Sequence, residues 1–121
     1  YTAMLPKLRI TKEVLYQATT TGFLNATDLA DYLVTKGMTF RESHSCVGKT
    51  VGYAASLKKE LHELTLEEMK SFSTLIAEDI FGILTPEEMI NRRTSFGGTA
   101  QENVKAAIQA ARERLAEAVC P

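Results

Sequence analysis

One short stretch carries residue types that could bind an anionic ligand. Arg93 and Ser95 precede the pair Gly97-Gly98, and Thr99 then opens a long segment with helical periodicity. Free backbone amides at the start of a helix attract carboxylates and phosphates. Arg93, Ser95, Gly97 and Gly98 are therefore candidates for a substrate-proximal or interdomain site.

The same residues fit a purely structural interpretation. Two glycines followed by Thr99 are what a sharp turn into a capped helix requires. Arg92 and Arg93 equally suit ion pairs with carboxylates across a domain or subunit contact. Both interpretations stay open at the level of sequence.

The other candidate groups favour structural roles. His44 falls on an apolar helical stripe, which favours a hydrogen-bonded core imidazole over a proton carrier, and His62 lies in an acidic neighbourhood typical of solvated surface. Gly48-Lys49-Thr50 resembles the tail of a phosphate loop, but the first glycine of that pattern would fall at Ser43. The residues predict no catalytic group, no metal site and no cofactor site.

Helices are expected to position all of these residues. Capping-box spacing occurs at four threonine–glutamate pairs: Thr39/Glu42, Thr65/Glu68, Thr85/Glu88 and Thr99/Glu102. Thr11 opens a short helix that ends at Gly22, and Asn25 or Thr27 opens one that ends at Gly37. No segment alternates with period two, so we predict an all-α domain of about six helices or helical turns without a sheet.

Two of the expected helices are long enough to show an apolar face. The stripe of the first comprises Phe40, Val47, Val51, Ala54 and Leu61, with Ser43, His44 and Gly48 along the same face. The stripe of the second comprises Val104, Ile108, Ala111, Leu115 and Val119. We expect each helix to pack through its stripe, and Gly48 to permit a close helix contact.

The composition of the chain narrows the classes of molecule that it is expected to bind. The chain has 121 residues, with 14 Lys plus Arg against 15 Asp plus Glu and a formal charge of -1, so no general field favours nucleic acid or an acidic membrane. Cys46 and Cys120 match no zinc or redox spacing, which fits a reducing, cytoplasmic setting. No apolar run approaches the roughly 20 residues that a membrane span needs.

Three stretches together resemble a known family. They are residues 22–33 (GFLNATDLADYL), residues 40–48 (FRESHSCVG) and residues 93–99 (RTSFGGT). In this order and at these separations they resemble the C-terminal domain of argininosuccinate lyase, of the fumarase and aspartase superfamily. On this resemblance, residues 1–10 are the end of a central-domain helix with its connector, and residues 11–121 are the C-terminal helical domain.

The resemblance implies a β-elimination that splits argininosuccinate into arginine and fumarate. The family's base is attributed to a serine on a loop resembling Gly-Ser-Ser-x-Met-Pro-x-Lys-x-Asn, which this sequence lacks. The resemblance therefore implies an isolated segment that is inactive and needs no cofactor. Its expected partners are the rest of the polypeptide and the other subunits of a homotetramer, with the substrate bound mainly outside this chain.

Two other function classes remain open. A helical interaction or assembly module derived from a lyase would have the same sequence features, because a detached domain looks alike whether or not its parent is active. Residues 27–36, a turn and the helix from Phe40 also allow a helix-turn-helix that binds DNA. Glu42 and Glu60 offset Arg41 and Lys49 on that helix, so its charge disfavours the DNA-binding alternative.

Overall fold

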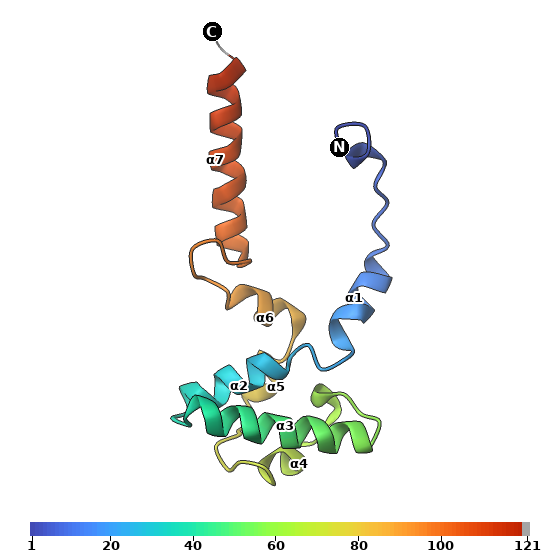
Figure 1. The fold of residues 1–121 in the computed structure, drawn as a ribbon, viewed down its shortest axis with the longest axis vertical. Coiled ribbons are helices and arrows are strands. Elements are labelled where there is room, and N and C mark those ends of the chain that lie inside the picture. The colour runs from blue at the N-terminus through green and yellow to red at the C-terminus, as the bar shows by residue number, and fades with distance from the viewer. Residues whose placement is uncertain (120–121) are drawn as a thin grey trace.

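The fold is all-α, as the sequence predicted. A computed structural model describes residues 1–119, and this part of the chain has seven α-helices, two 3₁₀ turns and no strand (Figure 1). The elements are a 3₁₀ turn at Leu5–Lys7, α1 at Lys12–Thr20, α2 at Ala26–Thr35, α3 at Phe40–Ser56, a 3₁₀ turn at Leu61–Glu63, α4 at Leu66–Lys70, α5 at Ile80–Ile83, α6 at Pro86–Asn91 and α7 at Gln101–Val119.

Helix starts follow the capping signals at three of the four predicted positions. The Thr39 and Thr65 side chains accept hydrogen bonds from the amides of Glu42 and Glu68. The carboxylates of these two glutamates in turn accept from the amides of Thr39 and Thr65. Thr85 likewise accepts from the Glu88 amide. The prediction for Thr99 is wrong, because α7 begins at Gln101 and the Ala100 carbonyl accepts its first bond, from the Val104 amide at 3.0 Å.

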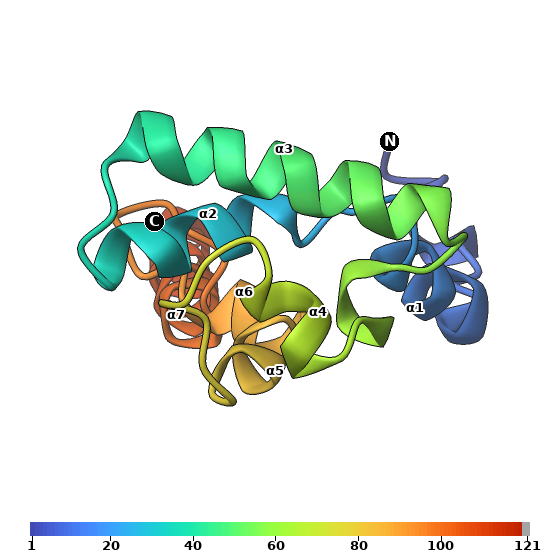
Figure 2. The same cartoon turned by 90° about the horizontal axis from the view of Figure 1, so that it is seen from below.

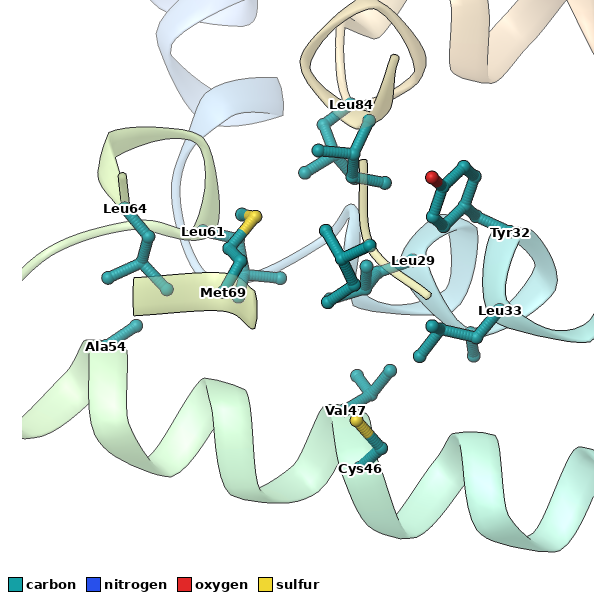
Figure 3. Packing of buried hydrophobic residues seen from close by; sticks show 13 residues of the cluster. Leu29, Tyr32, Leu33, Cys46, Val47, Ala54, Leu61, Leu64, Met69 and Leu84 are labelled. Carbon is teal, nitrogen blue, oxygen red and sulfur yellow. The ribbon is translucent and has the colours of Figure 1, made fainter. Parts of the chain in front are cut away.

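Helices α2 to α5 form the body of the molecule. Helix α3 lies along one side with α2 packed beside it, and α4 and α5 lie on the other side of the core (Figure 2). Figure 3 shows side chains from these helices and from the Leu61–Glu63 turn meeting in one cluster. Its fully buried members are Leu29, Leu33, Ala54, Leu61, Met69, Ile76 and Ile80. Burial of this apolar surface is the main force that holds the body together.

The buried face of α3 follows the predicted stripe at Val47 and Ala54 and departs from it at three other residues. Phe40 is 67% exposed and His44 is exposed, so the prediction of a core imidazole at His44 is wrong. Gly48 is also exposed, and a Cβ there would meet nothing within 4 Å, so its predicted close helix contact is wrong as well. Two hydroxyl residues of α3 are fully buried: Ser43, which was predicted on this face, donates to the Ala30 carbonyl of α2 at 2.7 Å, and Thr50 donates to the Cys46 carbonyl within α3. Their hydrogen bonds make the burial of these polar groups tolerable.

Two segments rise from the same side of the body. One is α7, and the other comprises residues 1–20 with α1 (Figure 1). The predicted apolar stripe of α7 is exposed, at 44% for Val104, 48% for Ile108 and 66% for Leu115, so the expected packing does not occur within the described chain. The side chain of Val119 and the whole of Cys120 lie outside what the structure describes.

Candidate functional site

The predicted site residues lie in the connection between α6 and α7. The Arg93 side chain points back to α2, where its Nη2 binds Asp28 Oδ1 at 3.0 Å and its Nη1 binds Asp31 Oδ2 at 3.4 Å. The ion pair that the sequence left open for Arg93 therefore forms within the domain. The Arg93 side chain remains 42% exposed.

Asp28 is the unusual member of this ion-pair cluster. Its side chain is 5% exposed, while that of Asp31 is 48% exposed. Burial raises the pKa of Asp28 above its ordinary value of 3.8, and the Arg93 guanidinium opposes that rise. A buried carboxylate is costly without a cationic partner, so Arg93 is needed to keep Asp28 charged inside the fold.

The main chain of Arg93 closes the connection into a loop. Its carbonyl accepts from the Ala100 amide at 3.2 Å and from Asn103 Nδ2 at 3.5 Å. The Ser95 carbonyl accepts from the Gly98 amide at 2.8 Å and from the same Asn103 amide group at 2.7 Å. Arg93 and Ala100 thus form the neck of a loop that spans residues 94–99, directly before α7.

The glycine pair is required by the geometry of this loop. Gly97 has a φ of +77°, in the left-handed region that glycine adopts without strain. At Gly98 a Cβ would overlap the Arg93 carbonyl oxygen. Ser95 and Gly97 are exposed in the loop, and Gly98 is half-buried against the neck. The structure therefore brings Arg93, Ser95, Gly97 and Gly98 together in one loop. It explains Arg93, Gly97 and Gly98 by their roles in the geometry of that loop.

An apolar hollow of about 680 Å³ lies beside this loop and along α7. The loop contributes Phe96, whose side chain is fully exposed, and α7 contributes Val104, Ile108 and Ala111 among others. The hollow continues the exposed apolar stripe of α7. Its lining is suited to apolar side chains of a partner surface more than to a charged ligand.

The remaining candidate residues form no reactive cluster. His44 and His62 are both exposed, on different elements, and Gly48-Lys49-Thr50 lies in the middle of α3. Among the described residues, no group of three or more His, Cys, Asp or Glu side chains could hold a metal ion. Burial raises the pKa of the Cys46 thiol, which is not how a reactive cysteine is arranged. None of the described helices combines the length and the hydropathy that crossing a bilayer requires.

Sequence reasoning missed two polar anchors of the body. The Tyr32 hydroxyl donates to Asp79 at 2.7 Å and accepts from the Ala77 amide at 3.1 Å, while Lys36 binds the other Asp79 oxygen at 2.9 Å. The sequence signal for this anchor was the spacing of Tyr32 and Lys36, which lie one helical turn apart at the end of α2 and directly after it.

The second anchor lies at the joint between α1 and α2. There Glu60 accepts from the consecutive amides of Gly22 and Phe23, at 3.0 and 3.2 Å. Both residues have positive φ, +79° and +57°, and Phe23 adopts this conformation at a steric cost. The two bonds from one carboxylate hold the joint in that conformation.

Comparison with known proteins identifies the family. The profile described as "Argininosuccinate lyase C-terminal" matches residues 23–91, which is more than half of the chain. The chain belongs to this argininosuccinate lyase C-terminal family. The matched residues run from the start of the α2 segment to the end of α6, so they contain the whole body of the domain.

Curated relatives of this family extend the match over almost the whole chain. The argininosuccinate lyase of Halorhodospira halophila is 49% identical over 113 residues, which are 93% of this chain and 24% of that protein. The enzymes of Desulfatibacillum aliphaticivorans and Oceanobacillus iheyensis are 45% and 47% identical over 95% and 98% of the chain. The chain spans about a quarter of the length of the curated relatives it matches.

Proposed function

We propose that this chain serves as the C-terminal domain in an enzyme that cleaves argininosuccinate into arginine and fumarate. The observation that carries the proposal is the alignment of nearly the whole chain, at 45–49% identity, with argininosuccinate lyases about four times its length. With the Oceanobacillus iheyensis enzyme the aligned span is 98% of the chain, so it also covers the Arg93 loop and nearly all of α7, which lie outside the family profile.

The chemistry of the proposed reaction lies elsewhere in such an enzyme. A β-elimination needs a base beside the carbon that loses its proton and fixed donors for the carbanion that forms. The described residues offer no paired base and orienting acid, and their buried hydroxyls at Ser43 and Thr50 are committed to carbonyl oxygens. We therefore expect the isolated chain to release no fumarate.

The domain's contribution is an interaction surface for the rest of the lyase. Helix α7 exposes a continuous apolar stripe beside the hollow at Phe96, and the segment before α2 exposes Leu5, Leu8, Ile10, Val14 and Leu15 on the same side of the body (Figure 1). Such contiguous apolar surface marks a protein contact. We place the remainder of the polypeptide, within a cytoplasmic homotetramer, against these two segments.

The Arg93 loop would then lie at the edge of this contact. Ser95 and Gly97 are exposed there, and Arg93 keeps part of its guanidinium accessible while it binds Asp28. We assign Arg93, Ser95, Gly97 and Gly98 to this substrate-proximal or interdomain boundary.

A graft tests the proposed function. The matching C-terminal quarter of the Halorhodospira halophila enzyme is replaced by this chain, and fumarate release from argininosuccinate is followed by ultraviolet absorbance. We expect the graft to be active and the isolated chain to be inactive. Fumarate release by the isolated chain would refute the division of labour, and a correctly assembled but inactive graft would refute the assignment to this reaction.

Paired variants of the graft test the α7 contact. Ile108→Glu and Leu115→Glu place a charge on the exposed stripe, and Gln109→Glu places the same charge on α7 outside the residues that line the hollow. The first two should weaken assembly and activity together, while Gln109→Glu should leave both near the level of the graft. Equal behaviour of all three variants would remove the stripe from the contact.

A further inference from the structure

The direction of α7 relative to the body depends on few contacts. Within residues 1–119, α7 makes no extensive contact with α2 to α6, and it stands away from them (Figure 1). Its attachment is the loop that ends at Ala100, which is 3% exposed. Whatever fixes this neck therefore fixes where the apolar stripe of α7 points.

Arg93 holds the neck from both sides. Its side chain reaches Asp28 and Asp31 on α2, and its carbonyl receives the Ala100 amide and the Asn103 side chain at the start of α7. One residue thus joins the body to the base of α7 through its side chain on one side and its main chain on the other.

The loop that Arg93 closes is shaped for this close approach. Gly98 packs against the Arg93 carbonyl where any Cβ would overlap it, and Gly97 turns the chain back in a left-handed conformation. The two ion pairs between Arg93 and α2 differ in length. The one with the buried Asp28 is shorter than the one with the half-exposed Asp31.

We propose that Arg93 and Ala100 form a hinge for α7, pinned to α2 by the Arg93 ion pairs with Asp28 and Asp31. With the pin in place, α7 and the body share one orientation. Release of the pin frees α7, together with the loop at its base, to swing as one unit while the body keeps its structure. The hinge is a property of this chain alone and does not depend on the proposed function.

Residual dipolar couplings of the backbone amides of the full 121-residue chain test the hinge. In the wild type, couplings from α2, α3 and the first turns of α7 should fit one alignment tensor. In Arg93→Ala, the α7 couplings should fall to roughly half or less while those of α2 and α3 are unchanged, because a swinging helix averages its amide directions. Arg41→Ala removes the same charge from α3, at an exposed residue that forms no ion pair in the described chain, and should behave as the wild type.

Two results would overturn the hinge. One is a single shared tensor in Arg93→Ala, and the other is separate tensors for the body and α7 already in the wild type. Should Arg93→Ala fail to fold, the double variant Asp28→Asn, Asp31→Asn removes both charged partners while it avoids an unpaired buried carboxylate. A single tensor in that folded variant would count against the pin as well.

Discussion

The link between α3 and α2 through Ser43 allows a sharp test of the packing that positions Asp28 and Asp31. Ser43 is fully buried, and its hydroxyl donates to the Ala30 carbonyl at 2.7 Å. Ser43→Ala deletes this bond and leaves the surrounding apolar side chains in place. Ser45→Ala is the matched control, since Ser45 lies on the same helix with an exposed side chain.

The expected size of the effect follows from two opposing contributions. A buried hydrogen bond contributes about 1 kcal/mol to the free energy of unfolding, and leaving its acceptor underused costs up to a similar amount. The replacement of serine by alanine inside a helix returns roughly 0.5 kcal/mol. We therefore expect Ser43→Ala to destabilise by about 1 kcal/mol and Ser45→Ala to stabilise by roughly 0.5 kcal/mol.

Urea unfolding followed by circular dichroism measures both variants against the wild type. The two should differ by about 1.5 kcal/mol with an unchanged slope against urea, because the surface exposed on unfolding stays the same. If Ser43→Ala is as stable as Ser45→Ala, the hydroxyl does not hold α3 against α2, and the interface rests on its apolar contacts alone.

Three further predictions concern the same body. Leu29→Ala should lower the free energy of unfolding by about 3 kcal/mol, because Leu29 is fully buried. Leu57→Ala is the control and should lower it far less, because Leu57 is 42% exposed. Similar urea midpoints for the two variants would contradict the assigned core. Gly48→Ala should stabilise the fold by about 1 kcal/mol, because the added Cβ meets open space within α3. Gly98→Ala should destabilise the fold, because its Cβ overlaps the Arg93 carbonyl. Thermal unfolding compares the two variants, and the opposite ranking would refute the geometry. The Tyr32 hydroxyl and then Lys36 lower the pKa of Asp79 below 3.8, so Asp79 stabilises the fold above about pH 4 and this contribution is lost as pH falls through the lowered pKa. Asp79→Asn should therefore be less stable than the wild type at pH 7, and the difference should vanish in acid. Urea titrations at both pH values measure this, with Glu78→Gln as the control.

Local signals in the sequence predicted six of the seven described helices, all but α5, and were insufficient for the faces of two of them. Thr39 and Thr65 cap helices because the cap needs only residues three positions away. On α3, Phe40 and His44 were wrongly assigned to the buried face and Thr50 was missed, because apolar periodicity gives aromatic rings more weight than small hydroxyl side chains. Small hydroxyl side chains can bond to a carbonyl and let helices approach, so α3 buries them and leaves the aromatic rings in solvent.

The loop before α7 could be recognised from sequence, but its connections to the body could not. Arg93, Ser95, Gly97 and Gly98 were found because glycine pairs before a helix are a local pattern. The partner of the Arg93 side chain lies 65 residues away at Asp28, and no spacing rule predicts such a pair. The stripe on α7 was likewise visible in the sequence, but periodicity cannot say whether the covering surface belongs to the same chain.

The most recognisable stretch of the sequence, residues 22–33, can now be explained without any catalytic role. Asp28 and Asp31 pin the Arg93 loop, and the carbonyl of Ala30 accepts from α3. Tyr32 holds the segment before α5 through Asp79, while leucines on the remaining face of α2 fill the core. One ten-residue helix makes all of these long-range links, so architecture explains its residues from Asp28 to Leu33. A motif that identifies a lyase can therefore mark the part that places an interaction surface, and it need not contain a reacting group.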